Sequence, residues 1–276
     1  MMYSPAEIAK RYSDAGGAKT RQSVCKTLVL AVFAGAYIAL GAYGSQIVAV
    51  GVPVAAVGKF LGALIFPIGL LMVIIAGAEL FTGNSLLIIS VLNREATPGG
   101  LLKNWGLVYI GNFAGGFLTA ALLTYSHSYS FLNGEMAQTV VNVAVGKVSL
   151  SPGDAFLRGI LCNILVCVAV WVSFSAEEAA GKILALFLPI VLFVVSGYEH
   201  CVANMYFISA GILVSREYGI AAAGLSWSSM LIKNLLPVTL GNIVGGAGIV
   251  GCGYYYVYLA KAKEKGFHAG AARKRA

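Results

Sequence analysis

Six long apolar segments make up most of the sequence, and they limit the chain to a membrane-spanning fold. They cover roughly residues 27–50, 60–92, 105–125, 156–175, 182–214 and 231–259. A helix needs about 20 apolar residues to cross a bilayer. Only 11% of the residues are charged, against about 25% in soluble domains, which is too few to cover a water-soluble surface. The sequence therefore predicts an all-α integral membrane protein with six transmembrane helices in a lipid bilayer.

The distribution of Lys and Arg predicts how the chain is oriented. Six spans place both termini on one side of the membrane, and that side carries fourteen of the 19 basic residues, against five on the other. Cytoplasmic loops hold such an excess, so we predict a multi-pass protein of the cell's inner (plasma) membrane with both termini in the cytoplasm. Because the basic residues gather at the chain ends and not on one folded surface, no nucleic-acid partner is predicted.

This orientation divides the chain into three regions. Residues 1–26 are polar and basic, and we expect an amphipathic cytoplasmic segment that lies on the membrane surface. Residues 27–259 form the predicted transmembrane domain. Residues 260–276 are predicted to be a basic cytoplasmic tail.

The second and fifth apolar segments are too long for one crossing and contain polar residues in the middle. These interruptions read AGAELFTGN at 76–84 and SGYEHCVAN at 196–204. We predict that both helices stop and restart near the membrane midplane, which is tolerated only inside protein or beside a cavity. Asn84 and Asn204 are expected to cap the restarting half-helices, and Gly83 is expected to permit the sharp backbone turn.

Two spaced motifs recur in the same order in both halves of the chain. Gly77-x-Glu79-x4-Asn84 returns as Gly197-x-Glu199-x4-Asn204, and a Lys-Asn…Gly-Asn…Gly-Gly pattern at 103–116 returns at 233–246. Three spans in each half force opposite orientations, so we predict a 3+3 inverted repeat with a permeation path or binding site where the broken helices meet. A purely structural repeat is the weaker alternative. Glu79 and Glu199 are expected to accept backbone N–H bonds around the breaks.

His200 is the one histidine that falls within a predicted span. Ionisable side chains inside a membrane are costly and therefore mark functional sites, and histidine changes its charge near neutral pH. Thr82 offers a hydroxyl in the other break, although a hydrogen bond to its own helix is an alternative. Half-helix N-termini carry partial positive charge. The pattern favours a pathway for an anion.

The sequence does not favour an enzyme, a metal site or a cofactor. Glu199, His200 and Cys201 are adjacent, so they cannot all face one metal ion, and neither an HExxH motif nor a GxSG serine is present. The five scattered cysteines are expected to be buried apolar residues without disulfides.

Three segments resemble signatures of the formate/nitrite transporter family. They are AGAELFTG at 76–83, GILCNILVCVA at 159–169 and GYEHCVANM at 197–205, and the similarity covers about residues 25 to 260. The resemblance implies an aquaporin-like protomer in a homopentamer, with a separate pore in each subunit. It identifies His200 as the central histidine and Thr82 as the residue that faces it. Cys201 stands where the family pattern leads us to expect serine.

The resemblance also implies roles for further positions along the pore. Asn163 and Asn242 match polar residues of the pathway, and Lys147 matches a residue that attracts anions, the alternative being a solvated loop lysine. Leu70 with Phe81 corresponds to a cytoplasmic constriction, and Leu80 with Phe193 to an outer one.

These observations lead to one functional hypothesis and two alternatives. We expect a channel or proton-linked transporter for small monovalent anions (formate, nitrite or hydrosulfide) that is gated by pH through His200. The alternatives are a neutral-solute pore for water or glycerol and a non-conducting membrane scaffold. Two apolar constrictions with a single titratable group argue against the neutral-solute pore.

Overall fold

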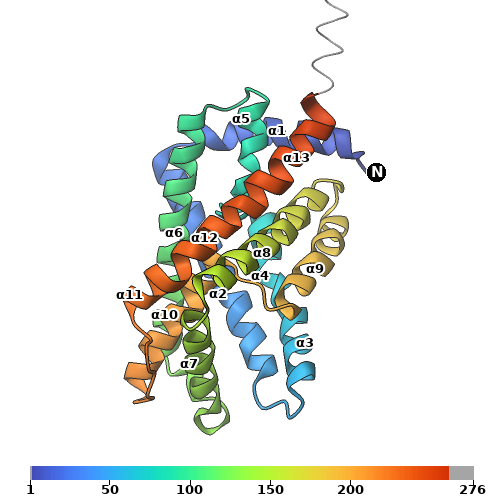
Figure 1. Ribbon diagram of the computed structural model, residues 1–276. Helices are drawn as coiled ribbons and strands as arrows, with labels where there is room; N and C mark the ends of the chain where they lie inside the picture. The colour runs from blue at the N-terminus through green and yellow to red at the C-terminus, as the bar shows by residue number, and fades with distance from the viewer. Residues whose placement is uncertain (1, 261–276) are drawn as a thin grey trace, which may run out of the picture.

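The computed structural model describes residues 2–260, and this region is helical, with one isolated β-bridge between Met2 and Ala176 (Figure 1). Its α-helices are α1 Pro5–Thr20, α2 Val24–Ala49, α3 Ala55–Ile65, α4 Pro67–Met72, α5 Ile88–Leu92, α6 Pro98–Tyr125, α7 Glu135–Val148, α8 Pro152–Ser173, α9 Ala179–Val195, α10 Cys201–Glu217, α11 Trp227–Ser229, α12 Leu236–Ile243 and α13 Cys252–Tyr255. The predicted all-α class is confirmed.

Within residues 2–260, five continuous helices are long and apolar enough to cross a membrane. They are Val24–Ala49, Ala55–Gly77, Pro98–Tyr125, Pro152–Ser173 and Trp227–Ala260. The second joins α3, α4 and a π-helical turn, and the last joins α11, α12 and α13 through π-helical turns. There are also two shorter apolar helices. Gly83–Leu92 follows the first predicted interruption, and Ala179–Val195 precedes the second.

Both predicted interruptions lack regular helix. The chain leaves helical structure after Gly77, where φ is +80°, and resumes a 3-10 turn at Gly83–Leu87. In the second half it leaves α9 at Val195, passes through Gly197 with φ of +70°, and resumes at α10. A positive φ is inexpensive only for glycine. The sharp geometry predicted for Gly83 therefore lies six residues earlier in the sequence, at Gly77.

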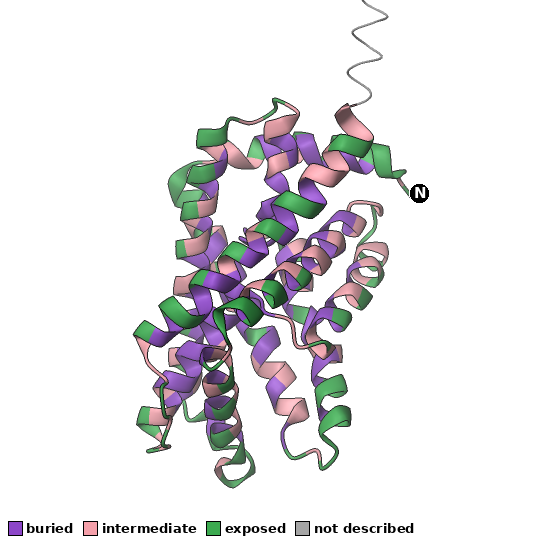
Figure 2. Cartoon of the chain, in the orientation of Figure 1, coloured by how far each residue is buried: buried purple, intermediate pink, exposed green. Residues whose placement is uncertain are grey.

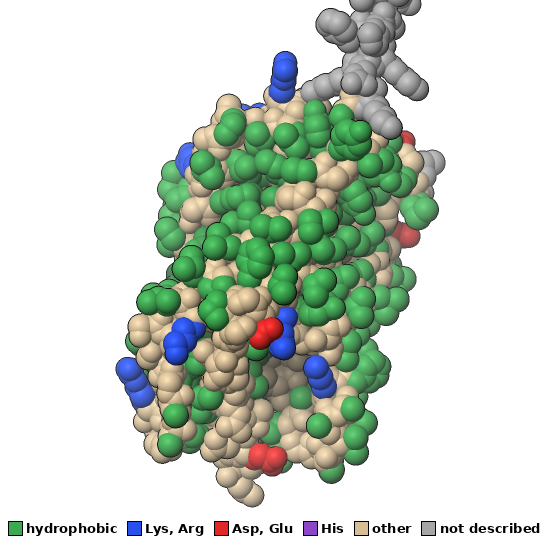
Figure 3. Space-filling model, in the orientation of Figure 1, with side chains coloured by type: hydrophobic (Ala, Val, Ile, Leu, Met, Phe, Trp, Pro, Cys, Tyr) green, Lys and Arg blue, Asp and Glu red, His purple; other side chains and the backbone are tan. Residues whose placement is uncertain are grey.

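The surface of the bundle is apolar. Figure 2 shows buried residues along the faces that the helices turn toward one another and exposed residues on the outer faces. Many of the exposed side chains are large and apolar, including Ile110 and Leu122 on α6 and Leu184 and Leu188 on α9. On the face in Figure 3 hydrophobic side chains form a broad band, with Lys and Arg above and below it. Such a surface suits contact with lipid.

The predicted N-terminal segment forms α1, which lies across one end of the bundle (Figure 1). Ser4 and Glu7 form a capping box at its start. Tyr12 is buried, its ring packs at 5.1 Å from Phe174, and its hydroxyl donates to the Gly83 carbonyl at 3.1 Å. The helix is therefore attached to the first interruption by a specific contact. The predicted tail, 260–276, lies outside the described residues apart from residue 260.

Close contacts at glycine join the helices within each half. A Cβ added to Gly115 on α6 would overlap the Val32 carbonyl oxygen of α2, and a Cβ on Gly245 would overlap the Ile160 carbonyl oxygen of α8. In a lipid bilayer the hydrophobic effect does not drive helices together, so they associate through close packing, which small residues allow. The Gly-Gly pattern of the repeat thus serves the same packing role in both halves.

We predict that Gly115→Ala lowers the stability of the protein by about 1–3 kcal/mol, the usual cost of overpacking. Gly106→Ala on the same helix is the matched control, because a Cβ there would meet nothing within 4 Å. Thermal unfolding in detergent measures both variants. Equal unfolding temperatures for the two would contradict the close-contact explanation.

Candidate functional site

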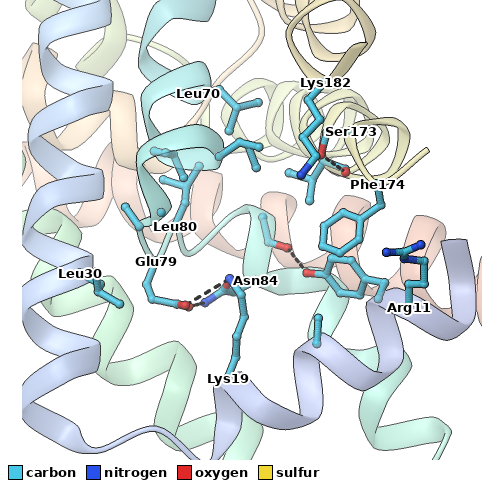
Figure 4. Close-up of a pocket in the computed structure, with 18 of the residues that line it drawn as sticks. Arg11, Lys19, Leu30, Leu70, Glu79, Leu80, Asn84, Ser173, Phe174 and Lys182 are labelled. Atoms are coloured by element: carbon cyan, nitrogen blue, oxygen red, sulfur yellow. Dashed lines mark hydrogen bonds and ion pairs between the residues drawn. The ribbon is translucent and has the colours of Figure 1, made fainter. Parts of the chain in front are cut away.

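Two cavities enter the protein from opposite ends. The α1-side cavity has a volume of about 730 Å³, and Figure 4 shows Lys19, Leu70 and Leu80 among its lining residues. The α7-side cavity has a volume of about 290 Å³ and is lined by Lys147 of α7 and by His200. Residues of the first interruption line the α1-side cavity and residues of the second line the α7-side cavity, so the two interruptions lie between them.

Thr82 and His200 meet where the interruptions approach each other. Thr82 Oγ1 lies 2.7 Å from His200 Nε2, and the two residues are 0% and 3% exposed. The structure thus brings together the two residues that the sequence proposed as the polar centre of the pathway. Phe193, on the α7 side, has its ring 5.9 Å from the imidazole.

Hydrogen bonding fixes which imidazole nitrogen carries the proton. His200 Nδ1 accepts the Ala203 N–H at 3.1 Å and so caps α10. An accepting nitrogen carries no hydrogen, so Nε2 carries the proton and donates it to Thr82 Oγ1. His200 is the one hydrogen-bond partner of the Thr82 hydroxyl within residues 2–260. The hydroxyl hydrogen of Thr82 therefore has no acceptor among the described residues.

The predicted caps at Asn84 and Asn204 are wrong. The residue that caps α10 is His200, and Thr82 precedes the first turn after the other interruption. The side chain of Asn204 instead donates to Glu199 Oε2 at 2.6 Å. A buried carboxylate attracts an amide donor more strongly than a backbone N–H attracts the amide oxygen.

The Glu199 network, made of Lys147, Glu199, Asn204 and Asn234, stabilises the second interruption. Lys147 Nζ lies 3.0 Å from Glu199 Oε1, and the two side chains are 15% and 6% exposed. Asn204 donates to Asn234 Oδ1 at 2.8 Å, and Asn234 donates to the Lys147 carbonyl at 3.0 Å. Lys147 is thus neither a free charge nor a solvated loop residue. From its position on α7, Lys147 neutralises the buried carboxylate of Glu199.

The Glu79 network, made of Lys19, Glu79, Asn84 and Asn104, repeats this arrangement in the first half. Lys19 Nζ lies 3.2 Å from Glu79 Oε1 and donates to Asn84 Oδ1 at 3.2 Å. Asn84 donates to Glu79 Oε2 at 2.6 Å and to Asn104 Oδ1 at 2.9 Å. Sequence reasoning missed Lys19 because α1 was expected to lie on the membrane surface, although Lys19 precedes α2 as Lys147 precedes α8. Asn104 belongs to the repeated Lys-Asn pair, which was the available signal.

Asn242 holds the backbone of the second interruption in place. Its Oδ1 accepts the Cys201 N–H at 2.9 Å, and its Nδ2 donates to the carbonyls of Gly159 at 2.8 Å and Glu199 at 3.0 Å. The resemblance implied a pathway role for Asn242. In the structure its amide is engaged with backbone groups.

Asn112 does the same for the first interruption, at the matching position of the repeat. It accepts the Phe81 N–H at 2.9 Å and donates to the carbonyls of Ala31 at 2.8 Å and Glu79 at 2.9 Å. Its place opposite Asn242 in the repeated pattern could have identified it from the sequence.

Asn163 of α8 is fully buried beside the central pair. Its Nδ2 lies 3.3 Å from the Thr82 carbonyl, 3.1 Å from Ser85 Oγ and 2.7 Å from the Asn242 carbonyl. Asn163 therefore orients the loop that carries Thr82.

The apolar residues predicted as constrictions are grouped differently in the structure. Leu80 lines the α1-side cavity with Leu70, and does not pair with Phe193. Phe81 lines neither cavity, because its ring packs on aromatic side chains of α6. Phe193 meets Phe66 at 5.3 Å in the α7-side cavity. Phe66 was missed because the sequence pattern does not distinguish it from the other aromatic residues of the apolar segments.

The site contains no arrangement suited to a metal ion. Across residues 2–260, no group of three His, Cys, Asp or Glu side chains is placed to bind one.

The whole helical region matches one known family. The family model described as "Formate/nitrite transporter" matches residues 6–256. The "Probable formate transporter" of Methanothermobacter thermautotrophicus is 38% identical, covering 93% of this chain and 97% of that protein. The "Formate channel FocA" of Escherichia coli (strain K12) is 35% identical, covering 92% of this chain and 94% of that protein.

Solved structures share the fold. A "Pentameric formate channel with formate bound" superposes with a TM-score of 0.76 at 34% identity, covering 86% of this chain and 98% of that one. An "FNT family ion channel" gives a TM-score of 0.82 at 28% identity, covering 91% of this chain and 98% of that one.

We predict that Lys147→Met destabilises the protein by about 3–5 kcal/mol, because it leaves the Glu199 carboxylate buried without its counter-charge. Adding Glu199→Gln should recover most of the loss, since the uncompensated charge is then removed. Thermal unfolding of both single variants and the double variant in detergent measures the coupling. Strictly additive effects would show that the ion pair contributes nothing specific.

Proposed function

Because the chain belongs to the formate/nitrite transporter family, we propose that it is a channel for small monovalent anions and that formate is its substrate. Several relatives are named as formate channels or transporters, and one similar structure is described as pentameric with formate bound. On this basis we also propose a homopentamer in which each protomer carries its own pore. The observation that carries the proposal is the Thr82–His200 contact between two cavities.

We propose that the chain crosses the inner membrane six times as a 3+3 inverted repeat, with the interruptions near the midplane and the α1 end in the cytoplasm. The matching roles of Asn112 and Asn242, and of Glu79 and Glu199, support the repeat. Backbone groups that leave a helix inside a bilayer need partners within the protein, and both asparagines supply them. The excess of Lys and Arg supports the orientation.

The proposed pathway runs between the two cavities past Thr82 and His200. Leu70 and Leu80 on one side and Phe66 and Phe193 on the other present apolar surface, which opposes a bare ion because desolvation is costly. The Thr82 hydroxyl supplies a hydrogen-bond donor between them. A single neutral donor gives weak binding, which lets the anion leave again.

We propose that His200 links transport to pH. A second proton on the ring must bind Nδ1, and this nitrogen already accepts the Ala203 N–H. Proton uptake therefore breaks the cap of α10. An anion beside the ring would stabilise the added charge. The charged groups that line the same cavity are Lys59, Lys147 and Glu199, and the last two are paired with each other.

A neutral-solute pore and a non-conducting scaffold are the competing functions. A non-conducting scaffold does not explain why the buried Thr82 hydroxyl, between two cavities, has a hydrogen without an acceptor. A water or glycerol pore gives no reason for paired apolar rings beside one imidazole.

We predict that purified protein in proteoliposomes carries formate, with nitrite and hydrosulfide as competitors. Glycerol should not swell the same vesicles above the protein-free rate. Thr82→Val should lower formate flux about tenfold, the effect of removing one hydrogen bond to a charged group, and Thr82→Ser should retain it. No formate flux from wild-type protein would reject the channel, and glycerol flux without anion flux would favour the neutral pore.

We predict that His200→Asn abolishes most of the pH dependence of formate flux, because asparagine cannot take up a proton. Asparagine is a good N-cap, so this variant preserves the start of α10 while it removes the titrating group and the donor to Thr82. Thr82→Ser is the control that keeps the imidazole. A His200→Asn pH profile that matches wild type would assign the pH dependence to another group.

A further inference from the structure

Gln46 is a buried amide in the α7-side cavity that the central site does not use. It lies on α2, is 6% exposed, and lines the cavity together with Lys147, Glu199 and His200. Its Nε2 has no hydrogen-bond partner within residues 2–260. An unpaired buried donor is costly, so its presence beside a cavity points to a partner that enters from outside.

A chain of hydroxyl groups fixes the direction of this amide. Tyr129 and Tyr206 are both 0% exposed, and their hydroxyl oxygens lie 2.9 Å apart. Tyr206 is the one hydrogen-bond partner of the Tyr129 hydroxyl in the described part of the chain. Tyr129 must therefore donate to Tyr206, because otherwise its hydrogen would be buried without an acceptor.

Tyr206 then has its own hydrogen left to donate. The acceptor is Gln46 Oε1, which lies 3.3 Å from the Tyr206 hydroxyl. With the amide oxygen occupied in this way, the NH₂ group of Gln46 remains unpaired. The reversed amide would leave one of the two tyrosine hydroxyls with an unpaired hydrogen instead. The two tyrosines thus hold Gln46 as a donor.

The charges around the cavity favour an anion without selecting among anions. Lys59 and Lys147 carry positive charge and Glu199 carries negative charge, so these three lining residues sum to one positive charge. Monovalent anions of similar size respond alike to such a field. A fixed amide donor adds chemical selectivity, because oxygen accepts an N–H bond well and sulfur accepts it weakly.

We propose that Gln46 is a specificity-determining residue that binds one oxygen of a small carboxylate or similar oxyanion in the α7-side cavity, before the anion reaches His200. The proposal deepens the channel function and rests on it. Gln46 lines the cavity while its Oε1 accepts from Tyr206, so its NH₂ group is the part of the side chain that remains for an anion. The site discriminates against hydrosulfide, which offers sulfur alone.

The test uses full-length protein in detergent and in proteoliposomes. Formate binding is measured by titration of ¹³C-formate, and the ratio of formate flux to hydrosulfide flux is measured in vesicles. Gln46→Met keeps the length of the side chain and removes its donor. We expect this variant to bind formate about tenfold more weakly, as expected for the loss of one hydrogen bond to a charged group, and to lower the flux ratio by a similar factor.

Two tyrosine variants separate the donor from general packing. Tyr206→Phe leaves Gln46 Oε1 without its donor, so the amide can reverse, and formate affinity should fall by a smaller factor. Tyr129→Phe leaves Tyr206 free to donate to Gln46, and affinity should stay close to that of wild type. Tyr206→Phe also serves as the readout if Gln46→Met does not fold.

Unchanged formate affinity in both Gln46→Met and Tyr206→Phe would overturn the proposal, as would an equal loss of formate and hydrosulfide flux. Formate binding by wild type without flux would reject the channel and leave the binding site standing. Flux by wild type with no effect of Gln46→Met would reject the binding site and leave the channel standing. Wild-type protein that binds no formate would reject the site as a carboxylate site.

Discussion

The fold depends on satisfying the backbone groups that are released where two helices stop inside an apolar bundle. Water can pair such groups at a surface, but within lipid or a packed core each unpaired group is costly. Asn242 accepts one N–H and donates to two carbonyls at the second interruption, and Asn112 repeats these three bonds at the first. One asparagine per half therefore makes each interruption stable, and the polar centre is built on the segments that they hold.

The buried carboxylates Glu79 and Glu199 follow from the same constraint. Each lies beside an interruption and binds amide groups from the next helix, and each needs a cation because an isolated buried charge is strongly unfavourable. The second half obtains its cation from Lys147 of α7, whereas the first obtains it from Lys19 of α1. The N-terminal helix thus supplies the positive charge of the first network from the same place in the chain order that α7 holds in the second half.

The sequence predicted features that are local or repeated along the chain. It did not predict features that depend on the direction in which a side chain points in the folded protein. The positions of both interruptions, the central pairing of Thr82 with His200 and the matched glutamates all follow from spacing or from the family resemblance. The grouping of Leu80 and Phe81 could not be predicted, because residues 78–82 form no regular helix and so have no helical period that tells which side chains line a cavity. Lys19 could not be predicted either, since its contact spans 60 residues of chain between positions 19 and 79.

The two halves share a backbone plan but differ in the chemistry of the centre. The shift that matches Glu79 with Glu199 places Leu80 opposite His200, so the imidazole has no counterpart in the first half. His200 uses one ring nitrogen to cap α10 and the other to donate to Thr82. The hydrogen bond to the helix start is therefore joined through one aromatic ring to the hydrogen bond with Thr82. Because both bonds use one ring, a proton that binds Nδ1 would break the cap of α10 and change the charge of the ring that contacts Thr82, which couples the start of α10 to the centre of the proposed pathway.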